Sequence, residues 1–321
     1  MSMKRRSFVK LAGLGLALAG SRAQAQPSSR PVRVIVPLPA GSSNDHAARV
    51  VSPALSRVLG QPFIVDNKAG GNGIPATQEV IRAAPDGLTL YFPSNSPVAV
   101  NVALVRNLPY DPRRDLSPIA GVNRTNHCLI VRSDFPANNF VEFVAYAKQR
   151  PGQVSMGYST TTAQMIIAAM NRQAGLDLLA VSYRGTPPTI TDVLGGTLNA
   201  TMVDPGNAMA QVRGGRMKAL AVTSGERNPL VPDWPAVSET IPGFDFTVWN
   251  AILGPPGMAK ELVDRISAAV RQVLGEREVV DGLAAGGTFP HYLTPDELKA
   301  TIESDIVKWT QAARDANVEP E

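Results

Sequence analysis

Cysteine and histidine are scarce in this chain of 321 residues. Cys128 is the only cysteine, so the chain cannot form an intramolecular disulfide. It precedes the apolar run at 129–131, which predicts a buried thiol in a strand and not a reactive one. His46, His127 and His291 are far apart and lack the spacing of metal ligands. The sequence therefore predicts neither a disulfide framework nor a metal site.

Motifs of catalysis and nucleotide binding are also missing. The chain has no Gly-x-Ser-x-Gly turn and no P-loop, and the pair Gly13 and Gly15 lies in a leader segment. Asp204 and a loop serine could in principle move a proton, but no histidine is placed to orient them. We therefore expect a protein with no catalytic residues and no cofactor, and a periplasmic hydrolase remains an alternative without a motif to support it.

The most apolar stretch near the N-terminus, residues 11–20, is far shorter than the roughly 20 residues that span a bilayer. It follows the basic segment Lys4-Arg5-Arg6-Ser7-Phe8-Val9-Lys10 and precedes Ala23-Gln24-Ala25, the order of a cleavable export signal. The paired arginines resemble the twin-arginine type of signal. We predict cleavage after Ala25 and a periplasmic protein, whereas the alternative of a membrane anchor conflicts with the short apolar run.

The excess of positive charge belongs to this leader. Residues 1–25 hold five basic residues and no acid, so the 31 Lys and Arg of the whole chain fall to 26 against 27 Asp and Glu. The sequence pI of about 9.3 thus describes the leader more than the mature protein. A nearly neutral mature chain gives no support for nucleic-acid or polybasic membrane binding, and we expect neither.

Short β-branched runs alternate with helical patterns along the mature chain. Such alternation predicts βαβ units, and because the pattern restarts near residue 128 it predicts two α/β lobes. The expected strands cover residues 32–36, 63–66, 88–92, 128–132, 154–157, 179–183, 200–203 and 218–223, and the expected helices cover 45–59, 74–84, 140–149, 163–175, 188–194, 208–214 and 259–274. A last helix should begin at Thr294-Pro295, where a capping hydroxyl precedes proline at the first helical position.

Small polar loops follow several of the expected strands. The first, residues 37–45, opens a helix, so its backbone N–H groups and the helix dipole could hold an anion. Comparable loops lie at 93–96, 158–162, 183–186 and 203–207. In α/β sheets, ligands bind outside the carboxyl ends of strands, so converging loops of this kind favour a binding cleft. Each loop taken alone is equally explained by helix capping.

An ordered set of short motifs resembles the Bug family of periplasmic solute-binding proteins, the receptors of tripartite tricarboxylate transporters. The resemblance extends from about residue 30 to the end of the chain. The motifs are Pro31-Val32-Arg33-Val34-Ile35-Val36-Pro37, Leu59-Gly60-Gln61-Pro62, Val65-Asp66-Asn67-Lys68-Ala69-Gly70-Gly71-Asn72-Gly73, Ala84-Pro85-Asp86-Gly87-Leu88-Thr89-Leu90, Asn107-Leu108-Pro109-Tyr110-Asp111-Pro112, Asp192-Val193-Leu194-Gly195-Gly196 and Lys218-Ala219-Leu220-Ala221-Val222-Thr223-Ser224.

This resemblance implies an α/β fold of the two-lobed, type II-like Venus flytrap kind, with mixed, largely parallel sheets and a C-terminal helical segment. Lobe 1 would comprise residues 26–125 and 249–321, and lobe 2 residues 126–248. It also implies a monomer that binds a small carboxylate between the lobes, such as a dicarboxylate, a tricarboxylate, an acidic amino acid or an aromatic acid. The partners would be membrane subunits of a tripartite tricarboxylate transporter. A sensor kinase as recipient of the ligand is an alternative that the sequence leaves open.

The resemblance also implies a set of site residues in the polar loops. They are Ala40, Gly41, Ser42, Ser43, Asn44, Asp45, Ser94, Asn95, Ser96, Ser159, Thr160, Thr161, Thr162 and, at the edge of the cleft, Asp204. Residues 42–45 and 158–162 depart from the small, glycine-rich loops usual in the family, which adds side-chain donors and reduces space.

Two charged residues have alternative roles. Asp45 could cap the helix that it precedes or could bind a ligand ammonium group, which would select amino acids over diacids. Arg184 could clamp a distal carboxylate of the ligand with two hydrogen bonds or could form a surface ion pair. The aromatic residues Tyr158 and Trp249 are interpreted as packing groups.

Overall fold

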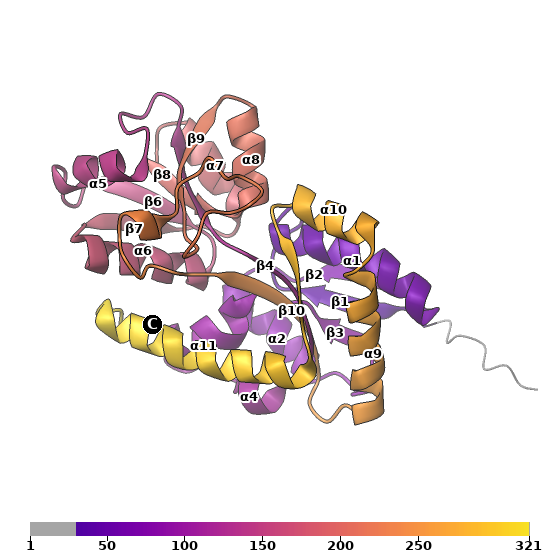
Figure 1. The fold of residues 1–321 in the computed structure, drawn as a ribbon. Helices are drawn as coiled ribbons and strands as arrows, with labels where there is room; N and C mark the ends of the chain where they lie inside the picture. The colour runs from indigo at the N-terminus through magenta and orange to yellow at the C-terminus, as the bar shows by residue number, and fades with distance from the viewer. Residues whose placement is uncertain (1–29, 321) are drawn as a thin grey trace, which may run out of the picture.

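Two α/β lobes make up the protein, each built on its own mixed β-sheet (Figure 1). The computed structural model describes residues 30–320, so the predicted export signal and its cleavage site lie outside the described residues. The two-lobed α/β architecture agrees with the prediction. Its division at residues 125/126 and 248/249 stays a prediction.

The first sheet has six strands in the order β11-β4-β10-β3-β1-β2. Their bounds are β1 Val32–Val36, β2 Phe63–Asn67, β3 Thr89–Tyr91, β4 Ser117–Thr125, β10 Val248–Gly254 and β11 Phe289–Leu293. Strand β1 is almost completely buried, as expected of a central parallel strand rich in valine and isoleucine. The chain leaves this sheet after β4 and returns to it at β10, so these neighbouring antiparallel strands join the lobes.

Helices cover both faces of the first sheet. One set comprises α1 Ser43–Leu59, α9 Lys260–Val273 and α10 Arg277–Ala285, whose apolar residues share a core with β1 and β4. The other set comprises η1 Gly71–Gly73, α2 Ile74–Ile81, η2 Ser96–Val100, α3 Asn101–Leu104, α4 Pro112–Asp115 and α11 Pro295–Asp315. Helix α1 continues through Pro53, which has no N–H to donate to the preceding turn.

The second sheet has five strands in the order β7-β6-β8-β5-β9. Its strands are β5 Cys128–Arg132, β6 Val154–Tyr158, β7 Leu178–Ser182, β8 Ala200–Val203 and β9 Met217–Val222. Its helices are α5 Phe140–Lys148, α6 Thr161–Ala174, α7 Thr186–Leu194, α8 Pro205–Arg213 and, before β10, η3 Val237–Glu239. Cys128 begins β5 and is fully buried, and burial raises the pKa of its thiol, as expected of an unreactive strand cysteine.

Pairing within the sheets corrects one detail of the prediction. The sheets are mixed, but parallel pairs do not predominate: β2, β1 and β3 are parallel, whereas β10 pairs antiparallel with both β3 and β4. In the second sheet β6 is parallel to β7 and β8, and β5 is antiparallel to β8 and β9. The reason is that the strands that follow the interlobe connections enter each sheet in the opposite direction.

Helix α11 packs against both lobes, which Figure 1 shows as the yellow helix beneath them. It begins with a capping box in which Thr294 accepts from the Glu297 N–H, and its Trp309 is fully buried. The Trp309 ring lies 5.2 Å from that of Phe246, in the segment that leads into β10. Trp249 donates to Asp305 over 2.7 Å, so it holds the crossing strand against α11 and acts in packing, as interpreted.

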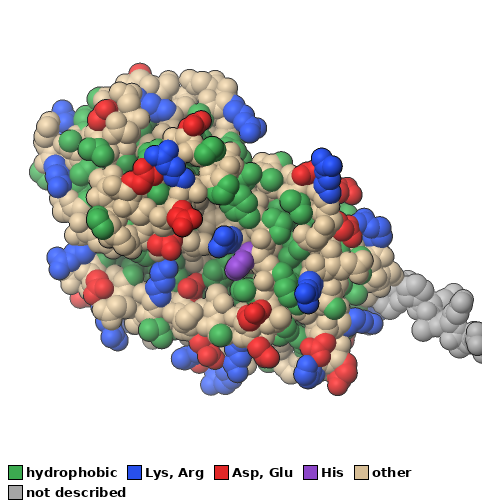
Figure 2. Space-filling view, in the orientation of Figure 1, with side chains coloured by type: hydrophobic (Ala, Val, Ile, Leu, Met, Phe, Trp, Pro, Cys, Tyr) green, Lys and Arg blue, Asp and Glu red, His purple; other side chains and the backbone are tan. Residues whose placement is uncertain are grey.

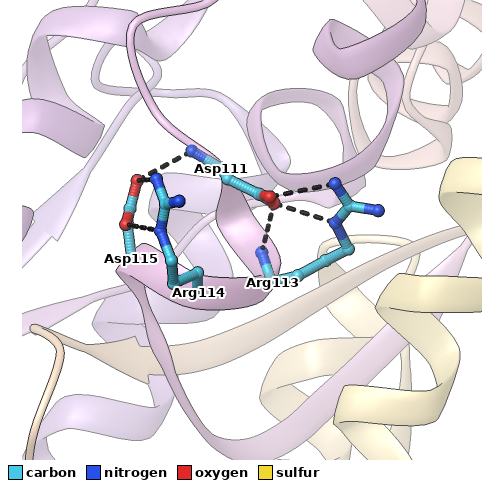
Figure 3. Close-up of polar contacts among 4 residues, drawn as sticks. All are labelled: Asp111, Arg113, Arg114 and Asp115. Atoms are coloured by element: carbon cyan, nitrogen blue, oxygen red, sulfur yellow. Dashed lines mark hydrogen bonds and ion pairs between the residues drawn. The ribbon is translucent and has the colours of Figure 1, made fainter.

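Short-range ion pairs hold the surface turn that leads into β4 (Figure 3). Asp111 caps α4 and accepts from the backbone N–H and the guanidinium of Arg113, while Asp115 accepts from Arg114 and from the Asp111 N–H. Exposed pairs of this kind contribute at most about 1 kcal/mol each.

Figure 2 shows acidic and basic side chains interspersed over one face of the molecule, without a basic patch on that face. None of the helices within residues 30–320 combines the length and apolarity needed to span a bilayer.

Candidate functional site

A cleft of about 350 Å³ lies between the two lobes, and we call it the outer cleft. Loops that follow β1, β2, β3, β6 and β7 supply its walls, which agrees with the rule that ligands bind outside the carboxyl ends of strands. Its lining residues are Pro37, Leu38, Pro39, Gly70, Gly71, Asn72, Gly73, Ser94, Ser96, Pro97, Ser159, Thr160, Thr161, Ser182, Tyr183 and Arg184. The volume suits a small organic molecule.

A tight glycine-rich turn, residues 70–73, forms one wall of the outer cleft. The Gly73 N–H donates to the Gly70 carbonyl oxygen over 3.0 Å, and Gly71 and Asn72 between them both have positive φ, at 54° and 52°. Asn101 donates to the Asn72 carbonyl and holds the turn in place. An added Cβ at Gly73 would lie 3.1 Å from Pro37, so the glycine lets the turn pack closely against the first loop. We did not predict this turn as part of the site, although the Gly-Gly-Asn-Gly run was a usable signal.

Arg184 is the one charged side chain among the residues that line the outer cleft. It is exposed, and the described residues offer it neither a hydrogen bond nor an ion pair. The alternative role as half of a surface ion pair therefore has no partner within residues 30–320. A free guanidinium at the cleft is suited to a carboxylate, which it can bind through two parallel hydrogen bonds.

A smaller space of about 40 Å³ adjoins the outer cleft, and we call it the inner chamber. The outer cleft and the inner chamber share four hydroxyl residues, Ser94, Ser96, Ser159 and Thr160. Its remaining lining residues are Leu38, Pro39, Ser42, Ser43, Asn44, Thr125, Asn126, His127, Thr162, Gly185, Thr186, Met202, Val203, Asp204, Val248 and Asn250. The inner chamber thus lies where the interlobe strands β4 and β10 pass between the lobes.

Two helices, one from each lobe, begin at the inner chamber. Ser42 caps α1 and accepts from the Asp45 N–H over 3.2 Å, and Thr160 caps α6 and accepts from the Ala163 N–H over 3.1 Å. Helices of 17 and 14 residues carry a partial positive charge at their N-termini. Their convergence, with the hydroxyls of Ser94, Ser96 and Ser159 nearby, creates an environment for a carboxylate group.

Several predicted site residues bind each other across the lobes. Ser96 Oγ and Thr162 Oγ1 are 2.7 Å apart, and Thr162 also donates to Asn95 Oδ1 over 3.2 Å. Thr161 donates to Asn101 over 2.9 Å. These bonds tie the start of α6 to η2 and α3, so the hydroxyls of Thr161 and Thr162 hold the lobes together in this arrangement. Asn95 is fully buried and does not line either cavity.

Backbone contacts also bring the lobes close together. An added Cβ at Gly185 would lie 2.9 Å from Pro39, and one at Gly206 would lie 2.6 Å from the carbonyl oxygen of Gly286. Side chains larger than hydrogen would therefore collide with the opposite lobe. The lobes are therefore in direct contact at these two points, where glycines permit the approach.

Asp45 lies outside both cavities, and its position in the helix differs from the prediction. The cap is Ser42, and α1 begins at Ser43, so Asp45 is the third helical residue. Its carboxylate accepts from the Gly41 N–H, from Arg49 and from Asn67, all within 3.0 Å. Burial opposes its ionisation, but these bonds together hold its pKa below the usual value. No free oxygen faces a ligand, which removes the basis for an ammonium contact.

The other predicted residues divide between the cavities and the wall behind them. Ser42, Ser43, Asn44 and Asp204 line the inner chamber, Gly41 lines a surface pocket beside α8, and Ala40 lines neither the outer cleft nor the inner chamber. Asp204 caps α8, and its two oxygens accept from the Asn207 N–H and side-chain amide. Burial is the main cause of its raised pKa.

His127 and Asn250 line the inner chamber and were absent from the predicted set. Burial lowers the pKa of His127 to about 4, and its Nδ1 has no partner in residues 30–320. No group of three or more His, Cys, Asp or Glu side chains in the described part of the chain is arranged to hold a metal ion. The two cavities thus combine hydrogen-bonding side chains, two helix N-termini, the Arg184 guanidinium and the buried Asp204 and His127.

Comparison with known proteins gives a consistent result. Residues 47–318 match the profile of the tripartite tricarboxylate transporter family receptor, TctC. Protein BugT of Bordetella pertussis (strain Tohama I) is 30% identical over 322 residues, which cover 98% of each chain. The solved periplasmic binding protein BugD has a TM-score of 0.85 at 28% identity and covers 91% of this chain and 99% of its own. Rpa4515 of R. palustris, solved with adipate, has a TM-score of 0.88 at 27% identity and covers 92% and 99%.

Proposed function

Because the chain belongs to the TctC family of tripartite tricarboxylate transporter receptors, we propose that it captures a small carboxylate between its lobes and delivers it to a transporter of that type. Members of this family are receptors and not enzymes. The protein has the α/β fold of periplasmic binding proteins. Adipate, a dicarboxylate, is bound by one structural relative, which supports a carboxylate as the ligand class.

The free Arg184 guanidinium is the observation that carries this proposal. It is the one charge that lines the outer cleft, and the two helix N-termini at the inner chamber add partial positive charge. A ligand of micromolar affinity needs about 8 kcal/mol. Charge-assisted hydrogen bonds of about 1.5 to 3 kcal/mol each supply this with four or five donors. The polar loops and Arg184 offer that number.

The proposed place of action is the periplasm. The basic segment, the short apolar run and Ala23-Gln24-Ala25 support export with cleavage after Ala25, and the paired Arg5-Arg6 supports the twin-arginine route. The mature protein, as a monomer, would bind its ligand there and present the closed lobes to membrane subunits of the transporter.

A carboxylate screen tests the proposal. We expect the melting temperature of the purified mature protein to rise with one or a few small carboxylates. We also expect that denaturing the protein releases a co-purified acid of the same class, which mass spectrometry identifies. Binding to the native state stabilises by about 2.7 kcal/mol at a ligand concentration 100 times the Kd. Neutral sugars of similar size are the control. A shift with sugars and none with any acid contradicts the proposal.

A further inference from the structure

Four buried polar side chains form a continuous line of hydrogen bonds behind the inner chamber. Asn44 Nδ2 donates to Asn250 Oδ1 over 3.0 Å, and Asn250 Nδ2 donates to Asn123 Oδ1 over 2.7 Å. Asn123 Nδ2 in turn donates to Thr288 Oγ1 over 3.1 Å. We call Asn44, Asn250, Asn123 and Thr288 the amide relay; each of them is at most 2% exposed.

The far end of the amide relay favours one direction. Thr288 Oγ1 donates its one proton to the carbonyl oxygen of Leu283 over 3.1 Å, and a carbonyl oxygen can only accept. Thr288 then accepts from Asn123, Asn123 accepts from Asn250, and Asn250 accepts from Asn44. A flip of the amides would reverse these bonds and lose the bond from Thr288 to Leu283, whose carbonyl also accepts from the N–H groups of Gly286 and Thr288, so the observed direction makes one more hydrogen bond than the flipped one.

Asn44 lines the inner chamber, and its unpaired group is a hydrogen-bond acceptor. Its Nδ2 is engaged by Asn250, and its buried Oδ1 has no partner within the described residues, although Asn44 lines the chamber. Buried polar atoms are nearly always satisfied, so this oxygen requires a donor. A carboxylate oxygen cannot supply one and would be repelled by it.

We infer that the ligand carries a hydroxyl group on the carbon next to its carboxylate, and that Asn44 recognises this hydroxyl. The inference rests on the proposed function: the helix N-termini and serine hydroxyls take the carboxylate, and the neighbouring hydroxyl donates to Asn44 Oδ1. The substrate class is therefore a 2-hydroxy acid. Asn44 is a specificity-determining residue, and Thr288 is a positioning residue that acts through the amide relay.

A hydroxyl fits this site better than an ammonium group. The two helix N-termini would repel a cation. No acidic side chain lines the outer cleft, and Asp204, the acid at the inner chamber, already accepts two bonds from Asn207. A neutral donor satisfies Asn44 without adding a buried charge that lacks a partner.

Matched acids that differ by one hydroxyl test the inference by calorimetry. The probes are lactate and propionate, malate and succinate, mandelate and phenylacetate, and 2-hydroxyadipate and adipate. In each pair that binds, we expect the hydroxy acid to bind at least tenfold more tightly, because the other acid leaves Asn44 unpaired. Equal affinities would mean that water satisfies Asn44 and would overturn the inference. So would tighter binding of aspartate than of malate.

The two proposals fail in different ways. A protein that binds both acids of a pair equally retains the proposed function and loses only the 2-hydroxy preference. A protein that binds no carboxylate contradicts the proposed function itself.

Two variants test whether the amide relay causes the preference for 2-hydroxy acids. Asn44→Ala should bring the affinity ratio of hydroxy acid to plain acid to within twofold of unity, and an unchanged ratio would overturn the role of Asn44. Thr288→Val removes the fixed direction of the relay, so Asn44 can turn its Nδ2 to the chamber. We expect the ratio to fall at least fivefold, mainly through tighter binding of the plain acid.

Thr201→Val is the matched control for Thr288→Val. Thr201 is equally buried and donates to the Gly157 carbonyl over 3.0 Å, but it is outside the amide relay and both cavities. In Thr201→Val the affinity ratio of hydroxy acid to plain acid should stay within twofold of that of the original protein. If Thr288→Val folds, binds and keeps the original ratio, the relay does not set the orientation of Asn44. If Thr288→Val does not fold, the paired acids and Asn44→Ala still decide the inference.

Discussion

The outer cleft and the inner chamber differ in how their polar groups are held. In the outer cleft the charged group, Arg184, is exposed and makes no hydrogen bond or ion pair with residues 30–320. In the inner chamber Asn44 is buried and held in one orientation by the amide relay. An exposed, solvated charge attracts any anion over a distance that salt can screen, whereas fixed buried groups discriminate among ligands. We therefore expect the outer cleft to contribute affinity and the inner chamber to contribute specificity.

Closure of the lobes should have the largest effect, because both cavities depend on it. In Gly206→Ala the new Cβ would meet the Gly286 carbonyl oxygen at 2.6 Å, so the lobes could not approach fully. We expect the Kd for the bound carboxylate, measured by calorimetry, to rise at least a hundredfold, about 2.7 kcal/mol. The melting temperature without ligand should stay close to that of the original protein.

Gly214→Ala is the control for the closure variant. Gly214 ends the same helix, and its added Cβ would meet only atoms of its own lobe, at 3.4 Å or more. It should bind normally. If Gly206→Ala also binds normally, the contact between Gly206 and Gly286 is not needed for ligand binding.

His127 should make the inner chamber sensitive to acid. Burial lowers its pKa to about 4 in the folded protein, against 6.5 for the free side chain, so below pH 6.5 the unfolded chain binds a proton that the folded chain does not. Stability from this group is complete above pH 6.5 and is lost as the pH falls toward 4. Between pH 7 and 4.5 we expect a loss of about 2 kcal/mol, since one pKa unit is worth about 1.4 kcal/mol.

Denaturant unfolding of His127→Gln isolates this contribution, because every other titrating group is shared with the original protein. The difference between the two unfolding free energies should change by about 2 kcal/mol between pH 7 and pH 4.5. A constant difference would show that His127 titrates normally in the fold.

Arg184 should have the smallest effect, and one that depends on salt. Replacement by alanine should weaken carboxylate binding about tenfold at low salt, and the loss should shrink in 0.5 M salt because the Debye length falls to a few ångströms. Arg184→Lys, which keeps the charge, should recover most of the affinity. The ratio between hydroxy and plain acids should not change in either variant. A changed ratio would mean that the outer cleft also contributes to specificity.

Local chemistry made most of the elements predictable. The strands Val32–Val36, Cys128–Arg132 and Ala200–Val203 match the expected ranges. Short runs of β-branched and apolar residues bounded by polar loops strongly favour strands over other secondary structure. Strands β4, β10 and β11 and helix α10 were not predicted. Strand β4 contains Pro118, Gly121 and Asn123, which are unfavourable in isolated strands, and it forms by pairing with β10 and β11, both from later in the chain.

The candidate site was predictable as a set of loops, but the roles of its side chains were not. Ser42, Thr160 and Asp204 all look like free ligand-binding groups in the sequence, yet an oxygen of each accepts a backbone N–H as a helix cap. Thr161 and Thr162 bind the other lobe. Conversely, Asn250 and His127 belong to interlobe segments that have no loop signature, and only the fold brings them beside the loop after β1.

The sequence by itself determined the alternation of strands and helices, the helix caps and the position of polar loops at the ends of strands, because these depend on residues close together in the chain. The tertiary structure alone decided which polar atoms remain free. The amide relay illustrates the reason: Asn44, Asn123, Asn250 and Thr288 are widely separated in sequence, and the Asn44 oxygen is left unpaired only because of the bonds that these residues make with one another. Hydrogen-bond satisfaction is a property of the assembled interior, so it cannot be assigned to any single segment.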